Sequence, residues 1–285
     1  MRLQARDYQE KIFAAKDLPT IPCLHDKLLR LIEDSNYSMD ELGRLIETDQ
    51  VLSSKVLKIV NSPFYGLYSN VASVERAIVL MGSNLIRGLI LSTSLFDAGD
   101  KTLPGLWDHS YYCSTVANFL ALKLNLGTRE EIMTGALLHD IGKVLIRKQL
   151  PDESKRIDEA VEAGGITMYE AEKRIIDTTH DEIGARLAVM WNLPKIIRDL
   201  IASHHRPGAC VNHPTEAEVV HLSDIIVKGL GISNPSDGCV PPFDVKGWAA
   251  LGLPEEDIGD IIGEIIDKMP EDVLLTYTPG GNDGR

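Results

Sequence analysis

The sequence predicts an all-α protein. Apolar residues recur at spacings of three and four along almost the whole chain, as they do on the buried face of an amphipathic helix. The alternation of apolar and polar residues that is typical of strands is scarce. Of the 285 residues, 44% are hydrophobic and 25% are charged, which is the composition of an ordinary globular protein.

The first part of the chain is predicted to form a series of short helices. Leu24, Leu28 and Leu31 follow each other at spacings of four and three, which places them on one helix face. A second helix is expected to begin at Ser38, because a serine followed three residues later by Glu41 matches a capping box. The segment NSPFYGLYS contains proline and glycine and predicts a loop. The other helical runs of this part are residues 52–60, 74–81 and 84–95.

The second part of the chain continues the helical pattern. Helices are predicted in LWDHSYYCSTVANFLALKL and in TGALLHDIGKVLI, and Gly142 is expected to let the second of these end. Thr179 and Glu182 match a second capping box, and Pro194 is expected to begin the helix that leads into His204. The other predicted helices are residues 152–163, 168–176, 217–230 and 258–266.

Composition and charge exclude several classes of protein. The formal net charge is −13 and no basic run is present, so we expect no nucleic-acid partner. No apolar stretch approaches the roughly 20 residues that cross a bilayer, and MRLQARDYQEKIF has no apolar region typical of a signal peptide. We therefore expect a cytoplasmic protein without a membrane partner. Four widely spaced cysteines without a C-x-x-C pair are predicted to be reduced and mostly structural.

Histidines and aspartates of the second part are the candidate functional residues. His139 and Asp140 stand side by side in the apolar run GALLHDIGKVLI, where they are either a structural polar pair or part of a metal site. Burying a carboxylate without a partner costs several kcal/mol, so Asp140 and Asp224 each require a cation or strong donors nearby. One shared metal site explains the whole set better than separate coincidences. The candidate metal ligands are His109, His139, Asp140, His180, His204, His205 and Asp224.

Imidazole and carboxylate groups together suit iron, manganese, zinc or nickel. Asp140 has two oxygens, so it is able to bridge two ions. Neighbouring helical residues diverge by roughly 100°, which would let His139 and Asp140 serve different positions of a two-ion cluster. His25, His213 and His221 are interpreted as ordinary core or surface histidines, with His221 at most a neighbour of the site.

The order of these ligands, H…HD…H…HH…D, is similar to the dinuclear pattern of the HD-domain superfamily found in the HD-GYP cyclic-dinucleotide phosphodiesterases. The chain as a whole resembles the HDOD family over roughly residues 18–230. No glycine-tyrosine-proline element follows His205, so cyclic di-GMP phosphodiesterase activity is not expected. The segments that carry the resemblance are LPTIP, LGRLIETDQVLSSKVLKIVNSPFYG, SVERAIVLMG, GALLHDIGKVLI and HDEIGARLAVMWNLPKIIRDLIASHH.

The resemblance implies an N-terminal helical subdomain packed on an HD-like helical bundle. The expected divisions are residues 1–100 for the N-terminal subdomain, 101–235 for the metal-binding core, 236–277 for a C-terminal helical extension and 278–285 for a disordered tail.

The resemblance also implies the roles of the ligands. One ion would be held by His109, His139, Asp140 and Asp224, and the other by Asp140, His180, His204 and His205. Iron is expected first, manganese next, with nickel or zinc as further possibilities. Lys143 matches a phosphate-facing lysine of related hydrolases, which makes Asp140 and Lys143 the candidate catalytic residues, and Arg206 is a further candidate anion contact.

Two functions stay open at this point. HDOD proteins are associated with bacterial signal transduction and are described as lacking a complete catalytic set, which favours a regulator that acts through a signalling partner or a small phosphorylated ligand. All seven ligand positions are filled here, which keeps open a metal-dependent phosphohydrolase of nucleotides or phosphodiesters. A helix-turn-helix DNA binder built on ERAIVLMGSNLIRGLI is disfavoured, because only Arg76 and Arg87 supply positive charge there.

Overall fold

The computed structural model describes residues 5–14, 23–33, 38–96, 103–232, 240–241 and 245–269. Within these ranges the chain forms α-helices, a few short 3-10 turns and the loops between them, with no strand. The all-α prediction is confirmed. No helix of the described ranges combines the length and the apolar character that crossing a bilayer requires.

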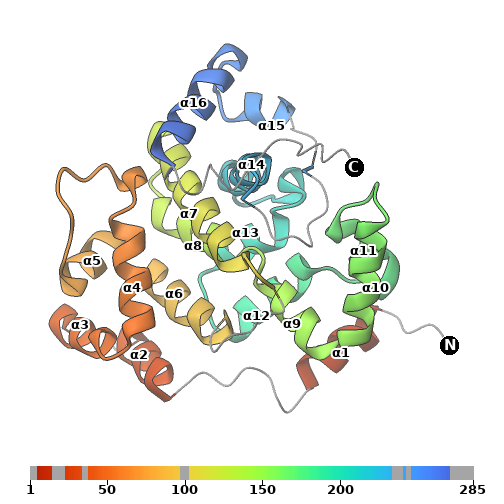
Figure 1. Cartoon of the computed structure of the whole chain (residues 1–285), viewed down its shortest axis with the longest axis horizontal. Helices are drawn as coiled ribbons and strands as arrows, with labels where there is room; N and C mark the ends of the chain where they lie inside the picture. The colour runs from red at the N-terminus through yellow and green to blue at the C-terminus, as the bar shows by residue number, and fades with distance from the viewer. Residues whose placement is uncertain are drawn as a thin grey trace, which may run out of the picture.

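The helices of the first part form one group on the left of Figure 1. The predicted Ser38 cap is confirmed, because the Ser38 hydroxyl accepts a hydrogen bond from the Glu41 amide at 3.0 Å. Asp49, which was not predicted as a cap, accepts one from the Leu52 amide at 2.9 Å at the start of the next helix. The bounds of the helices in this group are α2 (Cys23–Glu33), α3 (Met39–Glu47), α4 (Gln50–Val60), α5 (Val74–Met81) and α6 (Ser83–Phe96).

In the second part, α7, α8 and α14 all pack against one another. Within the same part, α12 contacts both α9 and α13. Helices α15 and α16 close the described chain. The bounds are α7 (Leu106–Lys123), α8 (Arg129–Leu138), α9 (Ile141–Gln149), α10 (Pro151–Glu162), α11 (Met168–Ile176), α12 (His180–Met190), α13 (Lys195–Ser203), α14 (Pro214–Gly229), α15 (Val245–Ala250) and α16 (Ile258–Lys268).

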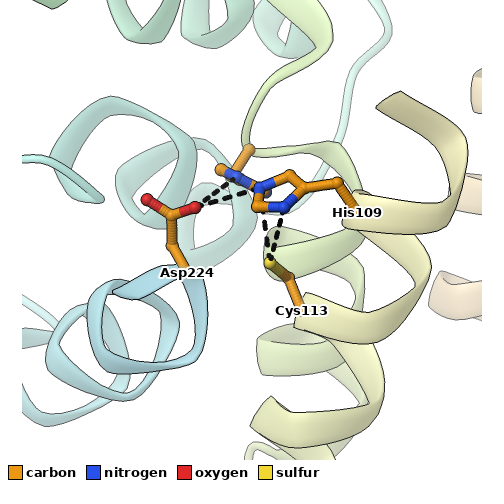
Figure 2. Close-up of side chains that lie close together, drawn as sticks. His109, Cys113 and Asp224 are labelled. Carbon is orange, nitrogen blue, oxygen red and sulfur yellow. Dashed lines mark hydrogen bonds and ion pairs between the residues drawn. The ribbon is translucent and has the colours of Figure 1, made fainter. Parts of the chain in front are cut away.

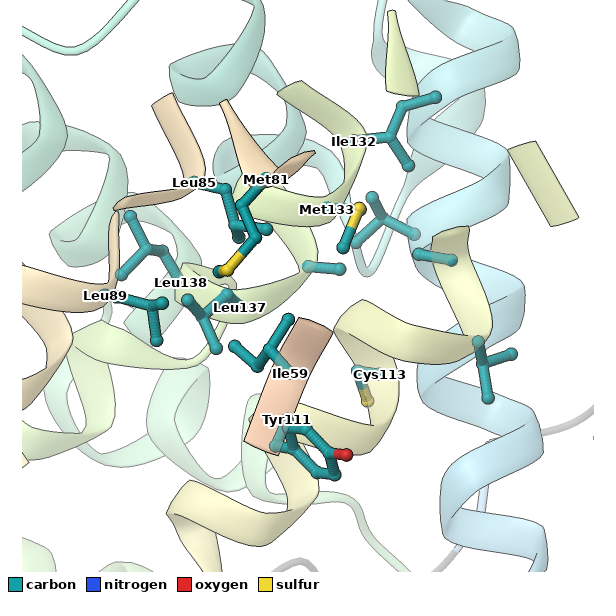
Figure 3. Close-up of a cluster of buried hydrophobic side chains, with 14 of the residues drawn as sticks. Ile59, Met81, Leu85, Leu89, Tyr111, Cys113, Ile132, Met133, Leu137 and Leu138 are labelled. Atoms are coloured by element: carbon teal, nitrogen blue, oxygen red, sulfur yellow. The ribbon is translucent and has the colours of Figure 1, made fainter. Parts of the chain in front are cut away.

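One hydrophobic core joins the two parts. Ile59 of α4, Leu89 of α6 and Leu137 of α8 are fully buried in the same cluster, which Figure 3 shows. The α6 helix lies against α8 and supplies much of this contact. Because these apolar side chains are removed from water where α6 meets α8, the N-terminal helices are held on the bundle that carries the candidate ligands.

Helix α1 (Ala5–Ala14) precedes this group in sequence but packs elsewhere. Its Tyr8 and Ile12 are buried in a second cluster, together with Leu145 of α9 and Ile157 of α10. The predicted division of the chain at residue 100 therefore stays a prediction, and the expected disordered tail, 278–285, lies outside the described residues.

Of the two predicted capping residues, Ser38 caps its helix and Thr179 does not. Helix α12 does begin at His180 as expected, but Thr179 bonds to the side chain of Asp181 and caps no backbone amide of the helix. A full capping box is found one helix earlier, where Thr167 and Glu170 satisfy each other's backbone amides at the start of α11. That box was missed by the sequence reading.

Helix α6, the candidate recognition helix of the disfavoured DNA-binding hypothesis, is packed inside the fold. Its Leu85, Ile86 and Ile90 are fully buried, and the helix contacts α2, α4 and α8. The guanidinium of Arg87 donates a hydrogen bond to the backbone oxygen of Trp191 at 2.7 Å. A recognition helix must lie in a DNA groove, and a helix packed in this way does not present the necessary surface.

Candidate metal centre

All seven predicted ligands come together inside the second part of the fold. Most of them stand where helices end or begin. His139 and Asp140 occupy the break between α8 and α9, His180 is the first residue of α12, and His204 and His205 follow α13 directly. Their side chains can therefore turn inward from converging helix ends. His109 and Asp224 reach the same point from within α7 and α14.

Gly142 has a different role from the one its sequence position predicted. Helix α8 already ends at Leu138, and Gly142 lies in the first turn of α9. A Cβ at this position would meet the backbone oxygen of His180 at 2.0 Å and the backbone nitrogen of Gly184 at 2.9 Å. The missing side chain allows α9 to approach α12, which brings His180 close to Asp140.

Asp140 lies between two groups of imidazoles. Its Oδ1 atom is 3.2 Å from His180 Nε2 and 3.8 Å from His204 Nε2. Its Oδ2 atom is 3.4 Å from His139 Nε2 and 3.7 Å from His109 Nε2. Each carboxylate oxygen thus faces a different group, which is the arrangement that a carboxylate bridging two metal ions requires.

The first group consists of His109, His139 and Asp224. Asp224 Oδ1 lies 3.0 Å from His109 Nε2 and 3.6 Å from His139 Nε2. Figure 2 shows His109 and Asp224 pointing toward one another from α7 and α14. The three side chains are at most 1% exposed.

The second group consists of His180, His204 and His205. Their ring nitrogens approach closely: His180 Nε2 is 3.3 Å from His204 Nε2 and 2.8 Å from His205 Nε2. Neutral imidazoles whose Nδ1 atoms carry the protons would direct lone pairs at one another here. Such an arrangement is stabilised by a cation at the point where the lone pairs meet.

The Nδ1 atoms of four ligands have partners that orient the rings. His109, His139 and His204 place Nδ1 at 2.7 to 2.9 Å from the backbone oxygens of Ile232, Ala136 and Ile201, respectively. His180 Nδ1 lies 2.7 Å from Glu172 Oε2. These contacts assign the proton to Nδ1 and leave Nε2 to face the centre, as is typical of histidines that bind metals.

Burial and charge point to the same chemistry. Asp140 Oδ1, Asp224 Oδ1 and His139 Nε2 are buried and have no hydrogen-bond partner among the described residues, although buried polar atoms are nearly always paired. The donor set therefore fits divalent metal ions: it offers imidazole nitrogen and carboxylate oxygen at these atoms.

The pKa values of the cluster reflect its crowding. Burial opposes a charge on His139, but Asp140 and Asp224 outweigh it and raise its pKa to about 9. For His180, Glu172 and Asp140 outweigh burial and raise the pKa to about 10. Burial lowers the pKa of His204 well below its ordinary value. Metal ions bind neutral imidazole, so their binding must displace the second proton, on Nε2, from His139 and His180 while the Nδ1 proton stays.

Two buried lysines flank the two aspartates. Lys143 donates to Asp140 Oδ2 at 2.7 Å, and Lys228 donates to Asp224 Oδ2 at 2.8 Å. Their ammonium groups help to hold the pKa of each carboxyl well below its usual range. Both lysines also line a pocket of about 210 Å³ that reaches His180 and His205. Lys143 thus lies beside the centre, as expected, but its closest partner is Asp140.

Sequence reasoning missed Glu172, Lys228 and Cys113. Lys228 stands four residues after Asp224 and Cys113 four residues after His109, so helical periodicity places each beside a predicted ligand. Glu172 lies on the buried face of α11 and reaches His180 only through tertiary packing, for which the sequence contains no local signal. Of the histidines interpreted as ordinary, His25 pairs with Asp49 away from the centre.

We expect the substitution Glu172→Gln to weaken metal binding by about 10- to 100-fold, because Glu172 fixes the ring and the backbone amide of His180. Metal titration followed by calorimetry would measure the change. Glu159→Gln, on the exposed face of α10, is the control and should leave the affinity unchanged. Equal affinities for Glu172→Gln and the native protein would contradict the orienting role.

The chain is similar in sequence to a known protein and in fold to several solved structures. A protein of Treponema pallidum (strain Nichols) is 26% identical over 228 residues, which cover 77% of this chain and 44% of the relative. The chain thus spans less than half of the length of that relative. An HDOD domain protein of unknown function from Geobacter sulfurreducens has a similar structure, with a TM-score of 0.66, 24% identity and coverage of 93% of this chain and 97% of that one.

Two further solved structures share the fold at lower identity. A proposed signal transduction protein from Marinobacter aquaeolei VT8 matches with a TM-score of 0.67 and 22% identity, over 97% of this chain and 61% of that one. A proposed metal-dependent phosphohydrolase from Shewanella amazonensis SB2B matches with a TM-score of 0.64 and 16% identity, over 96% and 97%.

The HDOD domain itself is recognised over residues 18–207. This range includes six of the seven candidate ligands and ends before Asp224, which α14 adds to the centre. With two thirds of its length matched and an all-helical structure like those of other HDOD proteins, the chain belongs to the HDOD domain family.

Proposed function

We propose that this chain is a cytoplasmic, metal-dependent HDOD regulator. In this proposal its centre holds two metal ions and binds a small phosphorylated ligand. Binding of that ligand then changes the interaction of the chain with a signalling partner. The observation that carries it is the position of Asp140, whose two oxygens face two separate sets of buried imidazoles.

Each ion would be held by four side chains, with Asp140 shared between the two. His109, His139, Asp140 and Asp224 would bind the first, while Asp140, His180, His204 and His205 would bind the second. Iron is the first candidate, manganese the next, and nickel or zinc are further possibilities, because histidine and carboxylate donors suit all of these metals.

The pocket beside the second group supports a phosphorylated ligand. Lys143 and Lys228 line it, and Tyr169 lies below the guanidinium of Arg206, whose carbon is 5.8 Å from the ring centre. Positive groups together with an aromatic ring suit an anion that carries a flat or apolar portion. A pocket of about 210 Å³ is smaller than the roughly 300–1,000 Å³ of most ligand pockets, which favours a small phosphoester.

A second function, hydrolysis of a phosphoester, is favoured by the same pocket, because it opens onto His180 and His205. A pair of divalent ions supplies Lewis acidity and neutralises the charge that develops on a phosphoryl group. Asp140 would fix the spacing of the pair, and Lys143 would orient a phosphate oxygen from the pocket side. The regulator and the hydrolase share every residue and differ in turnover alone.

One experiment separates the two functions. Protein loaded with manganese or ferrous iron is mixed with nucleotides and phosphodiesters, and both the shift in melting temperature and the release of product are measured. We expect a ligand that raises the melting temperature without turnover. Turnover that Asp140→Ala abolishes, and that the exposed-site control Asp108→Ala keeps, would instead establish the hydrolase. Neither binding nor turnover across the panel would contradict the phosphorylated ligand.

A further inference from the structure

The first ligand group contains a sulfur atom that the HD pattern does not include. Cys113 follows His109 by one helical turn on the same face of α7, and its side chain is fully buried. Its Sγ atom lies 3.5 Å from His109 Nε2. One donor atom from each of Cys113, His109, His139 and Asp224 falls within 4.8 Å of the others. Figure 2 shows the sulfur below the imidazole of His109, with Asp224 to the left.

Two further observations indicate that a cation belongs among these atoms. His139 Nε2 and Asp224 Oδ1 are buried, lack a hydrogen-bond partner in the described part of the chain and face the same space. His109 Nδ1 is engaged with the backbone oxygen of Ile232 at 2.9 Å, so its Nε2 lone pair also points there. Among the described residues, the contact of the thiol other than His109 is a long one, 3.9 Å to the backbone oxygen of Ser223.

The spacing of the atoms matches a coordination shell. With metal bonds of about 2.3 Å to sulfur and about 2.0–2.1 Å to nitrogen and oxygen, ligand atoms at angles of about 90–110° lie roughly 3.0–3.6 Å apart. The distance from Cys113 Sγ to His109 Nε2 is 3.5 Å, and those from Asp224 Oδ1 to His109 Nε2 and His139 Nε2 are 3.0 and 3.6 Å. The first two agree with ligands that share one ion at these angles, and the third, between an oxygen and a nitrogen, agrees at a wider angle of about 120°.

We propose that Cys113 is a thiolate ligand of the first metal ion, in addition to His109, His139, Asp224 and the bridging Asp140. The inference rests on the metal centre of the proposed function and adds a donor to it. A metal ion coordinates the thiolate, so the thiol proton would pass to solvent as the ion binds. A sulfur donor makes the two positions chemically different: the first favours zinc or iron, and the all-nitrogen-and-oxygen second accepts manganese.

The test uses cobalt(II) as the probe. The full chain, freed of metal, is titrated with cobalt under anaerobic conditions, and the near-ultraviolet thiolate-to-cobalt charge-transfer band is followed beside the visible bands. We expect the band in the native protein and in a Cys23→Ser/Cys210→Ser/Cys239→Ser variant, which keeps Cys113 as its sole cysteine. In Cys113→Ser we expect the band to fall to background while cobalt still binds.

A band that persists in Cys113→Ser, or that is absent from native protein with bound cobalt, would overturn the thiolate ligand and leave the dinuclear centre intact. Absence of any bound cobalt would overturn both proposals. Should Cys113→Ser fail to fold, X-ray absorption of the variant with Cys113 alone decides the matter. It should show sulfur at about 2.3 Å from the metal, and a shell of nitrogen and oxygen without sulfur would overturn the proposal.

Discussion

Replacing Gly142 with alanine is expected to lower the free energy of unfolding by about 3 kcal/mol or more. Overpacking a core usually costs about 1–3 kcal/mol, and the new methyl group would here meet backbone atoms of α12 instead of a flexible side chain. The closest of these is the oxygen of His180, at 2.0 Å. Helices α9 and α12 must then separate, which also moves His180 away from Asp140. Urea denaturation followed by circular dichroism would measure the loss.

The control for this change is Gly229→Ala. Gly229 ends α14, and a Cβ there would meet nothing within 4 Å, so its replacement should change stability by less than about 1 kcal/mol. Equal stabilities of Gly142→Ala and Gly229→Ala would show that α9 and α12 are not held in the close contact described above.

The substitution Asp140→Asn is expected to remove both metal ions. An amide keeps the shape of the side chain but offers one neutral oxygen, so it neither bridges two ions nor balances their charge. Loss of an outer partner of a ligand already costs about 10- to 100-fold in affinity, and loss of the bridge should exceed that range. Metal analysis by mass spectrometry, together with loss of the rise in melting temperature that bound metal produces, would measure the effect.

A matched control for Asp140→Asn exists in the first part of the fold. Asp49 also pairs with a histidine, since its carboxylate lies 2.8 Å from His25 Nε2, but it belongs to the start of α4 and not to the centre. Asp49→Asn should lose some helix stability and retain full metal content. Retention of both ions by Asp140→Asn would contradict the bridging role.

The helices themselves were largely predictable from the sequence. Apolar spacings of three and four located most of them to within a residue or two, and the Ser38 cap was correctly assigned. Local rules failed where tertiary contact decides. Thr179 has the sequence of a capping residue but bonds to Asp181, and Gly142 is needed for a close approach between helices instead of a helix end. Neither contact leaves a periodic signal in the chain.

The candidate ligands were predictable for a different reason. A buried carboxylate such as Asp140 is costly without a cation, so an aspartate in an apolar run indicates a site even before its partners are known. The order of the histidines then matched a family pattern. The side chains that contact the ligands were not found from the sequence. Glu172 of α11 reaches His180 of α12 through tertiary packing, and Cys113 was interpreted as an ordinary structural thiol. The chemistry of the ligands themselves is visible in the sequence, whereas the residues that support the ligands are found only from tertiary packing.

The metal content of the native protein tests the central claim most directly. The protein is purified without oxygen and without chelating resin, and iron, manganese, nickel and zinc are counted against protein concentration. Two buried groups of ligands that share Asp140 predict about two transition-metal ions per chain. Fewer than one ion per chain, in protein that remains folded and is offered excess metal, would contradict the account.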